Sequence, residues 1–250
     1  MSLYKVVNLI IDAEEMPESF EGFKCSGEQE PALRVRYVKS AELSGEVEGA
    51  LEINDIRTGR LKGGWLFESR RSGSRMWVND DYSLAEAGED VKKTPLIWRF
   101  FMQLFICGRL LDEGVLTLHS ACVKLDGRAY AFSAPSGTGK TTRAFAWEKA
   151  LGAEIISGDR PVIDVKSKKI CGIPWDGKER IFNNTSAGAG AIFQLRRAPF
   201  TRIRKLTDAQ KREFLIKQIY FPMWDGERAM KAMVLISEMI REIPVYRLFC

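Results

Sequence analysis

The chain has 250 residues, of which 45% are hydrophobic and 28% are charged, and its net charge is +5. This balance is typical of a globular protein and excludes a disordered or collagen-like chain, while the length allows a domain with a smaller appendage. The charge is uneven, because residues 1–95 hold 13 Lys/Arg against 18 Asp/Glu and residues 96–250 hold 25 against 15. A basic C-terminal part suits an anionic ligand.

The cysteines and the apolar stretches indicate the compartment. The five cysteines are scattered and show no CxxC spacing, which is typical of a reducing compartment. The apolar N-terminal run is short, and no small-residue cleavage pattern follows it. The most apolar stretch, Leu96–Leu111, is shorter than the roughly 20 residues that a bilayer core demands. We expect a cytoplasmic protein without membrane contact.

Residues 1–95 predict a small β-rich N-terminal domain. Short strand-like runs alternate there with turn-rich or acidic stretches such as Ser26–Glu30 and Glu86–Asp90. We find no repeat and no catalytic motif in this part. The expected strands are Leu3–Ile11, Leu33–Val38, Gly64–Phe67 and Arg75–Val78.

Residues 96–250 predict an α/β core in which strands and helices alternate. The Asp126-Gly127 pair is a strong hairpin signal between two strand-like runs. The expected helices are Leu96–Leu111, Lys140–Leu151, Thr207–Ile219 and Asp225–Arg241. The expected strands are Val115–Leu118, Ala121–Leu125, Arg128–Ser133, Glu154–Ser157, Val162–Val165, Lys169–Gly172, Ala191–Leu195 and Val245–Phe249.

The segment Phe132–Thr142 predicts a phosphate-binding loop, because it lies between an apolar strand and a helix. Gly137 and Gly139 let backbone N–H groups wrap around phosphate oxygens, and the helix points its positive end at them. Lys140 supplies a charge for the β- and γ-phosphates, and Thr141 offers a hydroxyl to Mg²⁺. ATP or another nucleoside triphosphate is the expected ligand, bound by Ser136, Gly137, Thr138, Gly139, Lys140, Thr141 and Thr142.

Four segments resemble one family. The loop Pro135–Thr142 is similar to the loop shared by phosphoenolpyruvate carboxykinases and HPr serine kinase/phosphorylases. Leu118–Ala121 resembles the His-bearing strand before that loop, Ile155–Arg160 resembles the acidic segment after it, and Gly172–Glu179 resembles a segment of small bacterial HPr-kinase homologues. The resemblance covers roughly residues 115–205. It implies a P-loop nucleotide-binding core of this type with a small β-rich N-terminal part, divided as residues 1–95 and 96–250.

The chain departs from the expected pattern at three points. Ala134 stands where the phosphate loop usually begins with glycine, and Gly158 stands where the family often has the first of two aspartates. The Arg-Gly-x-Gly signature of true HPr kinases is not recognisable, so HPr itself is not the expected substrate. The departures at Ala134 and Gly158 motivate a nucleotide-binding switch or scaffold without turnover as an alternative function.

Asp159 is the best candidate for catalysis, because it follows a short apolar strand, 19 residues beyond Lys140. The resemblance implies that it binds the metal with Thr141 or acts as a general base. His119, the only histidine, is expected to orient Asp159 or to contact the transferred phosphoryl group. Arg160 is expected to stabilise transition-state charge, and Lys178 to reach the phosphates or the substrate. Weaker candidates are Asp164, Glu179, Asn183 and Asn184.

The leading hypothesis is a kinase that transfers the γ-phosphoryl group of ATP to a serine of a peptide or small protein. The peptide acceptor is implied by the resemblance alone, and a small-metabolite kinase is the enzymatic alternative. The basic run Arg196–Lys217 predicts a solvated face, with a peptide-docking or phosphate-steering surface as the other interpretation. Its aromatic residues are too sparse for single-stranded nucleic acid, which is not an expected partner. A homo-oligomer is compatible with these features.

Overall fold

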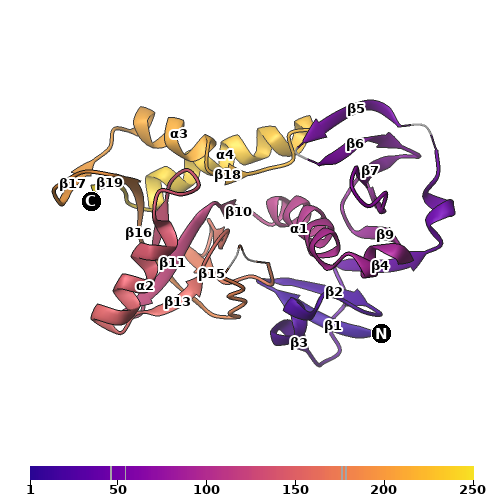
Figure 1. The fold of residues 1–250 in the computed structure, drawn as a ribbon, viewed down its shortest axis with the longest axis horizontal. Coiled ribbons are helices and arrows are strands. Elements are labelled where there is room, and N and C mark those ends of the chain that lie inside the picture. The colour runs from indigo at the N-terminus through magenta and orange to yellow at the C-terminus, as the bar shows by residue number, and fades with distance from the viewer. Residues whose placement is uncertain (46, 54, 176, 178) are drawn as a thin grey trace. The chain divides into compact units, whose positions relative to one another are not determined.

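The computed structural model describes residues 1–45, 47–53, 55–175, 177 and 179–250. Two compact units are present: unit 1 comprises residues 1–110 and 222–226, and unit 2 comprises residues 111–221 and 227–250. Each contains one large mixed sheet and few helices, so the expected mixed α/β class is confirmed (Figure 1). Within the described ranges, no helix has both the length and the apolarity to cross a membrane.

Unit 1 is built on a nine-stranded sheet with the order β3-β1-β2-β4-β9-β8-β7-β6-β5. Its strands are β1 (Ser2–Val6), β2 (Leu9–Ala13), β3 (Lys24–Cys25), β4 (Leu33–Val38), β5 (Glu48–Ile53), β6 (Ile56–Leu61), β7 (Gly64–Ser69), β8 (Arg75–Asn79) and β9 (Leu84–Gly88). Short 3-10 helices are η1 (Glu18–Phe23), η2 (Ser40–Leu43) and η3 (Glu89–Lys93). β4 pairs in parallel with both β2 and β9, which makes the sheet mixed.

The first predicted strand, Leu3–Ile11, forms two strands in the structure. β1 and β2 pair in an antiparallel hairpin whose last register pair is Val6 with Leu9. Val7 occupies the turn with φ 58°, a left-handed conformation that valine rarely adopts. An apolar residue at the turn therefore concealed the break between the strands.

Helix α1 (Pro95–Asp112) packs with the N-terminal sheet as far as Leu110. Trp98 donates from Nε1 to the Tyr37 hydroxyl at 3.0 Å, and their rings meet edge to face. Gly108 lies so close to Tyr82 that an added Cβ would be 2.1 Å from the ring. Unit 1 therefore continues beyond residue 95, where the sequence placed the end of its N-terminal domain.

The short segment 222–226 also belongs to unit 1. Trp224 donates from Nε1 to the Tyr82 hydroxyl at 3.0 Å, and its ring meets that of Phe67 edge to face. Both partners come from the N-terminal sheet region. The indole thus joins a segment late in the chain to the core of unit 1.

Unit 2 is built on a ten-stranded sheet with the path β13-β11-β12-β16-β15-β14-β10-β18, and β19 joins β16 while β17 joins β19. Its strands are β10 (Val115–Leu118), β11 (Ser120–Leu125), β12 (Arg128–Ser133), β13 (Glu154–Ser157), β14 (Val162–Asp164), β15 (Lys169–Cys171), β16 (Ser186–Arg196), β17 (Arg202–Lys205), β18 (Ile219–Tyr220) and β19 (Val245–Phe249). Its helices are α2 (Lys140–Leu151), α3 (Asp208–Ile216) and α4 (Gly226–Glu242).

Several strands of unit 2 end at one common edge of the sheet. β12 and β19 both run parallel to β16. β11 is antiparallel to both β12 and β13, so β13 points the same way as β12. The carboxyl ends of β12, β13, β16 and β19 therefore lie on the same side of the sheet, where ligands commonly bind in open α/β sheets. We call this side the carboxyl edge.

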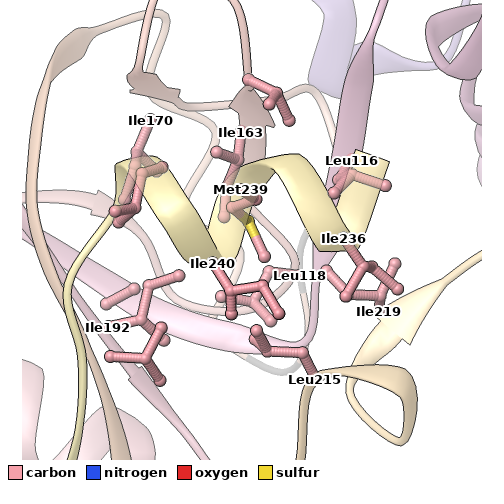
Figure 2. Packing of buried hydrophobic residues seen from close by; sticks show 14 of the residues in the cluster. Leu116, Leu118, Ile163, Ile170, Ile192, Leu215, Ile219, Ile236, Met239 and Ile240 are labelled. Carbon is pink, nitrogen blue, oxygen red and sulfur yellow. The ribbon is translucent and has the colours of Figure 1, made fainter. Parts of the chain in front are cut away.

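Two hydrophobic clusters support the carboxyl edge. One includes Ile236, Met239 and Ile240 of α4 together with residues of the central strands, and Figure 2 shows these α4 side chains beside Leu118 and Ile163. The second cluster includes Ala134, Ala144, Phe132 and Phe193, with Trp147 of α2 packed against it. The apolar surface that both clusters bury stabilises the fold by about 25 cal/mol for each Å² removed from water.

Strands β16 and β17 of unit 2 differ from the prediction, and Ile219, expected at the end of a helix, begins strand β18. β16 begins at Ser186 rather than at Ala191, because glycines and alanines in its first half hide the strand pattern. Gly190 is needed there, since a Cβ would approach the Tyr130 ring to 2.7 Å. β17 lies inside the basic run and has no apolar alternation, with all four residues exposed.

Candidate phosphate site at the carboxyl edge

The predicted phosphate loop connects β12 to α2. Gly137 and Gly139 have φ 76° and 103°, and a Cβ added to either would meet nothing within 4 Å. Backbone conformation, rather than crowding, therefore explains both glycines. Gly139 caps α2, so the N–H groups of the first helical turn, at Lys140, Thr141 and Thr142, lack helical acceptors.

Ala134 lies inside the core rather than on the ligand side of the loop. It is fully buried and belongs to the hydrophobic cluster with Phe132 and Ala144. Pro135, Ser136 and Gly137, which follow, are exposed. The methyl group that replaces the usual glycine hydrogen is thus accommodated by packing.

Lys140 folds back over the loop. Its Nζ donates to the carbonyl oxygens of Ala134 at 3.1 Å and Pro135 at 3.5 Å, and the residue is 8% exposed. Burial lowers its pKa, while the charges of Asp159 and Glu179 raise it. Thr138 closes the turn, because its hydroxyl donates to the Pro135 carbonyl at 2.9 Å. The ammonium group is therefore held inside the loop by neutral oxygens that a phosphate would replace or join.

Asp159 lies just beyond the carboxyl end of β13. Its Oδ1 is 3.4 Å from His119 Nε2, and its Oδ2 is 3.6 Å from Arg160 Nε. The side chain is 19% exposed. Ser157 donates to the Asp159 carbonyl at 3.1 Å and so fixes the backbone there. The structure thus brings Asp159, His119 and Arg160 together.

His119 sits between β10 and β11, anchored by its backbone. Its N–H donates to the Gln218 carbonyl at 2.8 Å, and its own carbonyl accepts from the Ser133 hydroxyl at 2.8 Å. Burial lowers its pKa below the usual 6.5, and the charges of Lys140 and Arg160 lower it further, against opposing effects of Asp159 and Gln218. The net effect favours the neutral imidazole.

Arg160 adopts φ 31°, which is rare for a residue with a side chain. Conformations of this kind cost of the order of 1–3 kcal/mol and cluster at functional sites. Here the unusual backbone places Arg160 Nε beside Asp159 Oδ2.

Two described residues of the Gly172–Glu179 segment, Gly177 and Glu179, lie near the candidate site. A Cβ added to Gly177 would be 3.3 Å from Asp159 Cβ, and Glu179 influences Lys140 through its charge. Trp175 is buried and supports the segment from below. Lys178 lies outside the described residues.

Two of the weaker candidates, Asn183 and Asp164, make hydrogen bonds within unit 2. Asn183 donates from Nδ2 to the Ile155 carbonyl at 2.7 Å, which ties its loop to β13. Asp164 accepts from the Ser167 hydroxyl at 2.6 Å and from two backbone N–H groups in the following turn. Asn183 thus links its loop to a strand, and Asp164 shapes the turn that follows it.

The sequence did not reveal a small cavity beside the loop. It has a volume of about 130 Å³, and Pro135 contributes to its wall. Cationic side chains from three elements also line it: Arg196, Lys217 and Arg247. We call this cavity the arginine pocket. Two features of the sequence could have indicated this pocket: the basic run Arg196–Lys217 and Arg247 in the last strand.

The sequence matches no family model, and no curated protein matches it.

Proposed function

We propose that unit 2 is a P-loop phosphotransferase core, which transfers the γ-phosphoryl group of ATP to a hydroxyl group with Mg²⁺ as cofactor. The observation that carries the proposal is the Asp159–His119 pair at the carboxyl edge, where the phosphate loop also lies. Metal binding alone accounts for the carboxylate, whereas the imidazole beside it suits a group that must be oriented for proton transfer.

The loop supports the proposal that ATP is the phosphoryl donor. Backbone N–H groups at the start of α2, the positive φ of Gly137 and Gly139, and the buried ammonium of Lys140 all suit polyphosphate oxygens. Ser136, Thr138 and Thr142 add hydroxyl groups around the same turn.

Thr141 and Asp159 would hold Mg²⁺. Hydroxyl and carboxylate oxygens are the ligands that this ion prefers, and it usually takes only one or two protein ligands beside the phosphates. When bound, the ion neutralises charge on the β- and γ-phosphates.

The reaction needs one group to take a proton and others to hold charge. In the proposed step, the acceptor oxygen bonds to the γ-phosphorus, the bond from phosphorus to the bridging oxygen of ADP breaks, and the hydroxyl proton passes to the Asp159 carboxylate. His119, whose Nε2 lies 3.4 Å from Asp159 Oδ1, would orient the carboxylate, and Lys140 and Arg160 would stabilise negative charge on the phosphates.

A serine of a peptide or small protein is the proposed acceptor, by analogy with the family that the loop resembles. A small-metabolite kinase is the enzymatic alternative. A nucleotide-binding switch is the non-enzymatic one, and it would keep ATP binding without transfer.

The test is a radiolabelled γ-phosphate assay with peptide, small-molecule and no-substrate arms, run beside calorimetry with ATP and Mg²⁺. Transfer that Lys140→Ala and Asp159→Asn both abolish would support the enzyme, provided that Asp159→Asn still binds ATP. Clear ATP binding without transfer in any arm would favour the switch. Absence of ATP binding by the unaltered protein would refute the whole proposal.

A further inference from the structure

The arginine pocket lies at the carboxyl end of β16, beside Arg247 in the middle of β19, and is bounded by α3. Gln194 and Arg196 of β16 and Arg247 of β19 contribute to its walls. Arg247 Nε donates to Gln194 Oε1 at 2.8 Å, which fixes the guanidinium in the pocket wall. A held guanidinium presents its remaining N–H donors in a defined direction.

The pocket carries an excess of positive charge. Its walls include Arg196, Arg247 and Lys217 against one carboxylate, that of Glu213. Glu213 is paired with Lys217 at 2.8 Å in an exposed ion pair. Burial lowers the pKa of Arg247, and the neighbouring charges of Arg196 and Arg204 lower it further. The two pocket arginines thus repel each other and would gain from an anion between them.

The pocket adjoins the proposed reaction centre. Pro135 of the phosphate loop forms part of its wall, and Gln194 pairs in register with Ser133, the last residue before Ala134 and the loop. On another side lies Gln218, whose carbonyl holds the His119 backbone. A molecule in this pocket would therefore lie next to the loop and His119.

Size and charge select the ligand. At about 130 Å³, the pocket is smaller than the roughly 300–1,000 Å³ of typical small-molecule sites, so it suits one side chain better than a nucleotide. Guanidinium groups bind carboxylates and phosphates alike. The positive walls attract either anion, and a carboxylate is the one that an unmodified peptide acceptor carries, so we assign the pocket to a carboxylate.

We propose that the arginine pocket binds an acidic side chain of the phosphate acceptor, so that the acceptor is a peptide segment with Asp or Glu near its reacting serine. This inference rests on the phosphotransferase proposal. It adds that Arg196 and Arg247 determine acceptor specificity without touching the nucleotide.

The test uses two synthetic fluorescent peptides, each with one serine and with either glutamates or glutamines at the flanking positions. Binding is measured by anisotropy with the full-length protein, with and without a saturating non-hydrolysable ATP analogue and Mg²⁺. The glutamate peptide is expected to bind about 10-fold to 100-fold more tightly than the glutamine peptide, as for a charge-assisted hydrogen bond. Arg247→Gln should remove this preference.

Arg128→Gln is the matched control, because Arg128 is an exposed arginine at the opposite end of β12 from the loop. The control should keep the preference, and loss of the preference in both variants would refute the pocket in favour of diffuse attraction. Arg196→Gln is the second variant, and thermal unfolding of each protein verifies that it is folded. A preference that survives both Arg247→Gln and Arg196→Gln would also overturn the inference.

Two further measurements distinguish a carboxylate site from a phosphate site, and anion binding from phosphoryl transfer. Inorganic phosphate at the same concentration should compete less well than glutarate, and the reverse order would overturn the assignment to a carboxylate. Transfer of γ-phosphate is measured on the same peptides. A glutamate preference in binding without transfer would refute the phosphotransferase and leave the anion site standing, whereas transfer with equal use of both peptides would refute the pocket alone.

Discussion

The phosphate loop and the arginine pocket are neighbours at one edge of the same sheet, yet they are built in different ways. The loop is a single continuous segment whose proposed ligand groups are mostly backbone N–H groups, set by the positive φ of Gly137 and Gly139. The pocket collects side chains from β16, α3 and β19, which are far apart in the sequence. A site made of local backbone can be identified from a motif, whereas a site made of distant side chains needs the fold.

The largest expected effect separates chemistry from binding at the loop. Asp159→Asn keeps the shape of the side chain but removes the proton acceptor, so γ-phosphate transfer should fall about 10²-fold to 10⁴-fold. ATP affinity should stay within a few-fold of its original value. Single-turnover transfer and calorimetry provide the two measurements, and undiminished transfer would remove Asp159 from the mechanism.

Lys140→Ala tests whether the loop and the pocket are energetically separate. Loss of the buried ammonium should weaken ATP binding about 10-fold to 150-fold, since a hydrogen bond to a charged group contributes about 1.5–3 kcal/mol. Binding of the glutamate peptide should not change. Calorimetry with each ligand measures both effects, and a comparable loss of peptide binding would show that the two sites are one.

Gly139→Ala tests whether the loop depends on the positive φ of its backbone. No atom lies within 4 Å of the new methyl group, but φ 103° is strained for alanine. We expect a loss of about 1–3 kcal/mol in the free energy of unfolding, measured by denaturant titration. Alanine at Gly188, which has no crowding and no positive φ, is the control and should cost less than about 1 kcal/mol.

The smallest expected effect concerns His119, which lies beside Asp159. Its pKa is lowered in the folded state, so the unfolded state takes up the proton first as the pH falls. The stability that His119 contributes is complete above its unfolded pKa of about 6.5 and is lost as the pH falls through the lower folded value. His119→Gln should flatten this part of the curve of stability against pH. An unchanged curve would mean that other groups dominate it.

The sequence predicted most of unit 2 because its signals are local. The strand before the loop, the turn at Asp126-Gly127 and helix α2 all appeared at the expected residues. The prediction failed where a local pattern was misleading, as at Val7 in the first hairpin and in the acidic stretch Glu86–Asp90, part of which is strand β9.

In the candidate site, too, the residues with local signals could be predicted and the others could not. Asp159 and His119 were selected because each lies next to a strand end near the motif, and the structure places Nε2 and Oδ1 3.4 Å apart. The pairing of Arg247 with Gln194 depends on β19 lying beside β16, a parallel pairing of strands that are separated by two helices in the sequence. Only the three-dimensional fold makes that neighbourhood visible.

Because residues 222–226 belong to unit 1, the two units cannot be separated by cutting the chain at one position. The polypeptide passes from one unit to the other at three places, so no single cut yields a fragment with all of its native contacts. A clone ending at residue 110 would lack the indole that bonds to Tyr82, and a clone starting at residue 111 would expose Trp224 to water. Neither unit corresponds to one uninterrupted stretch of codons.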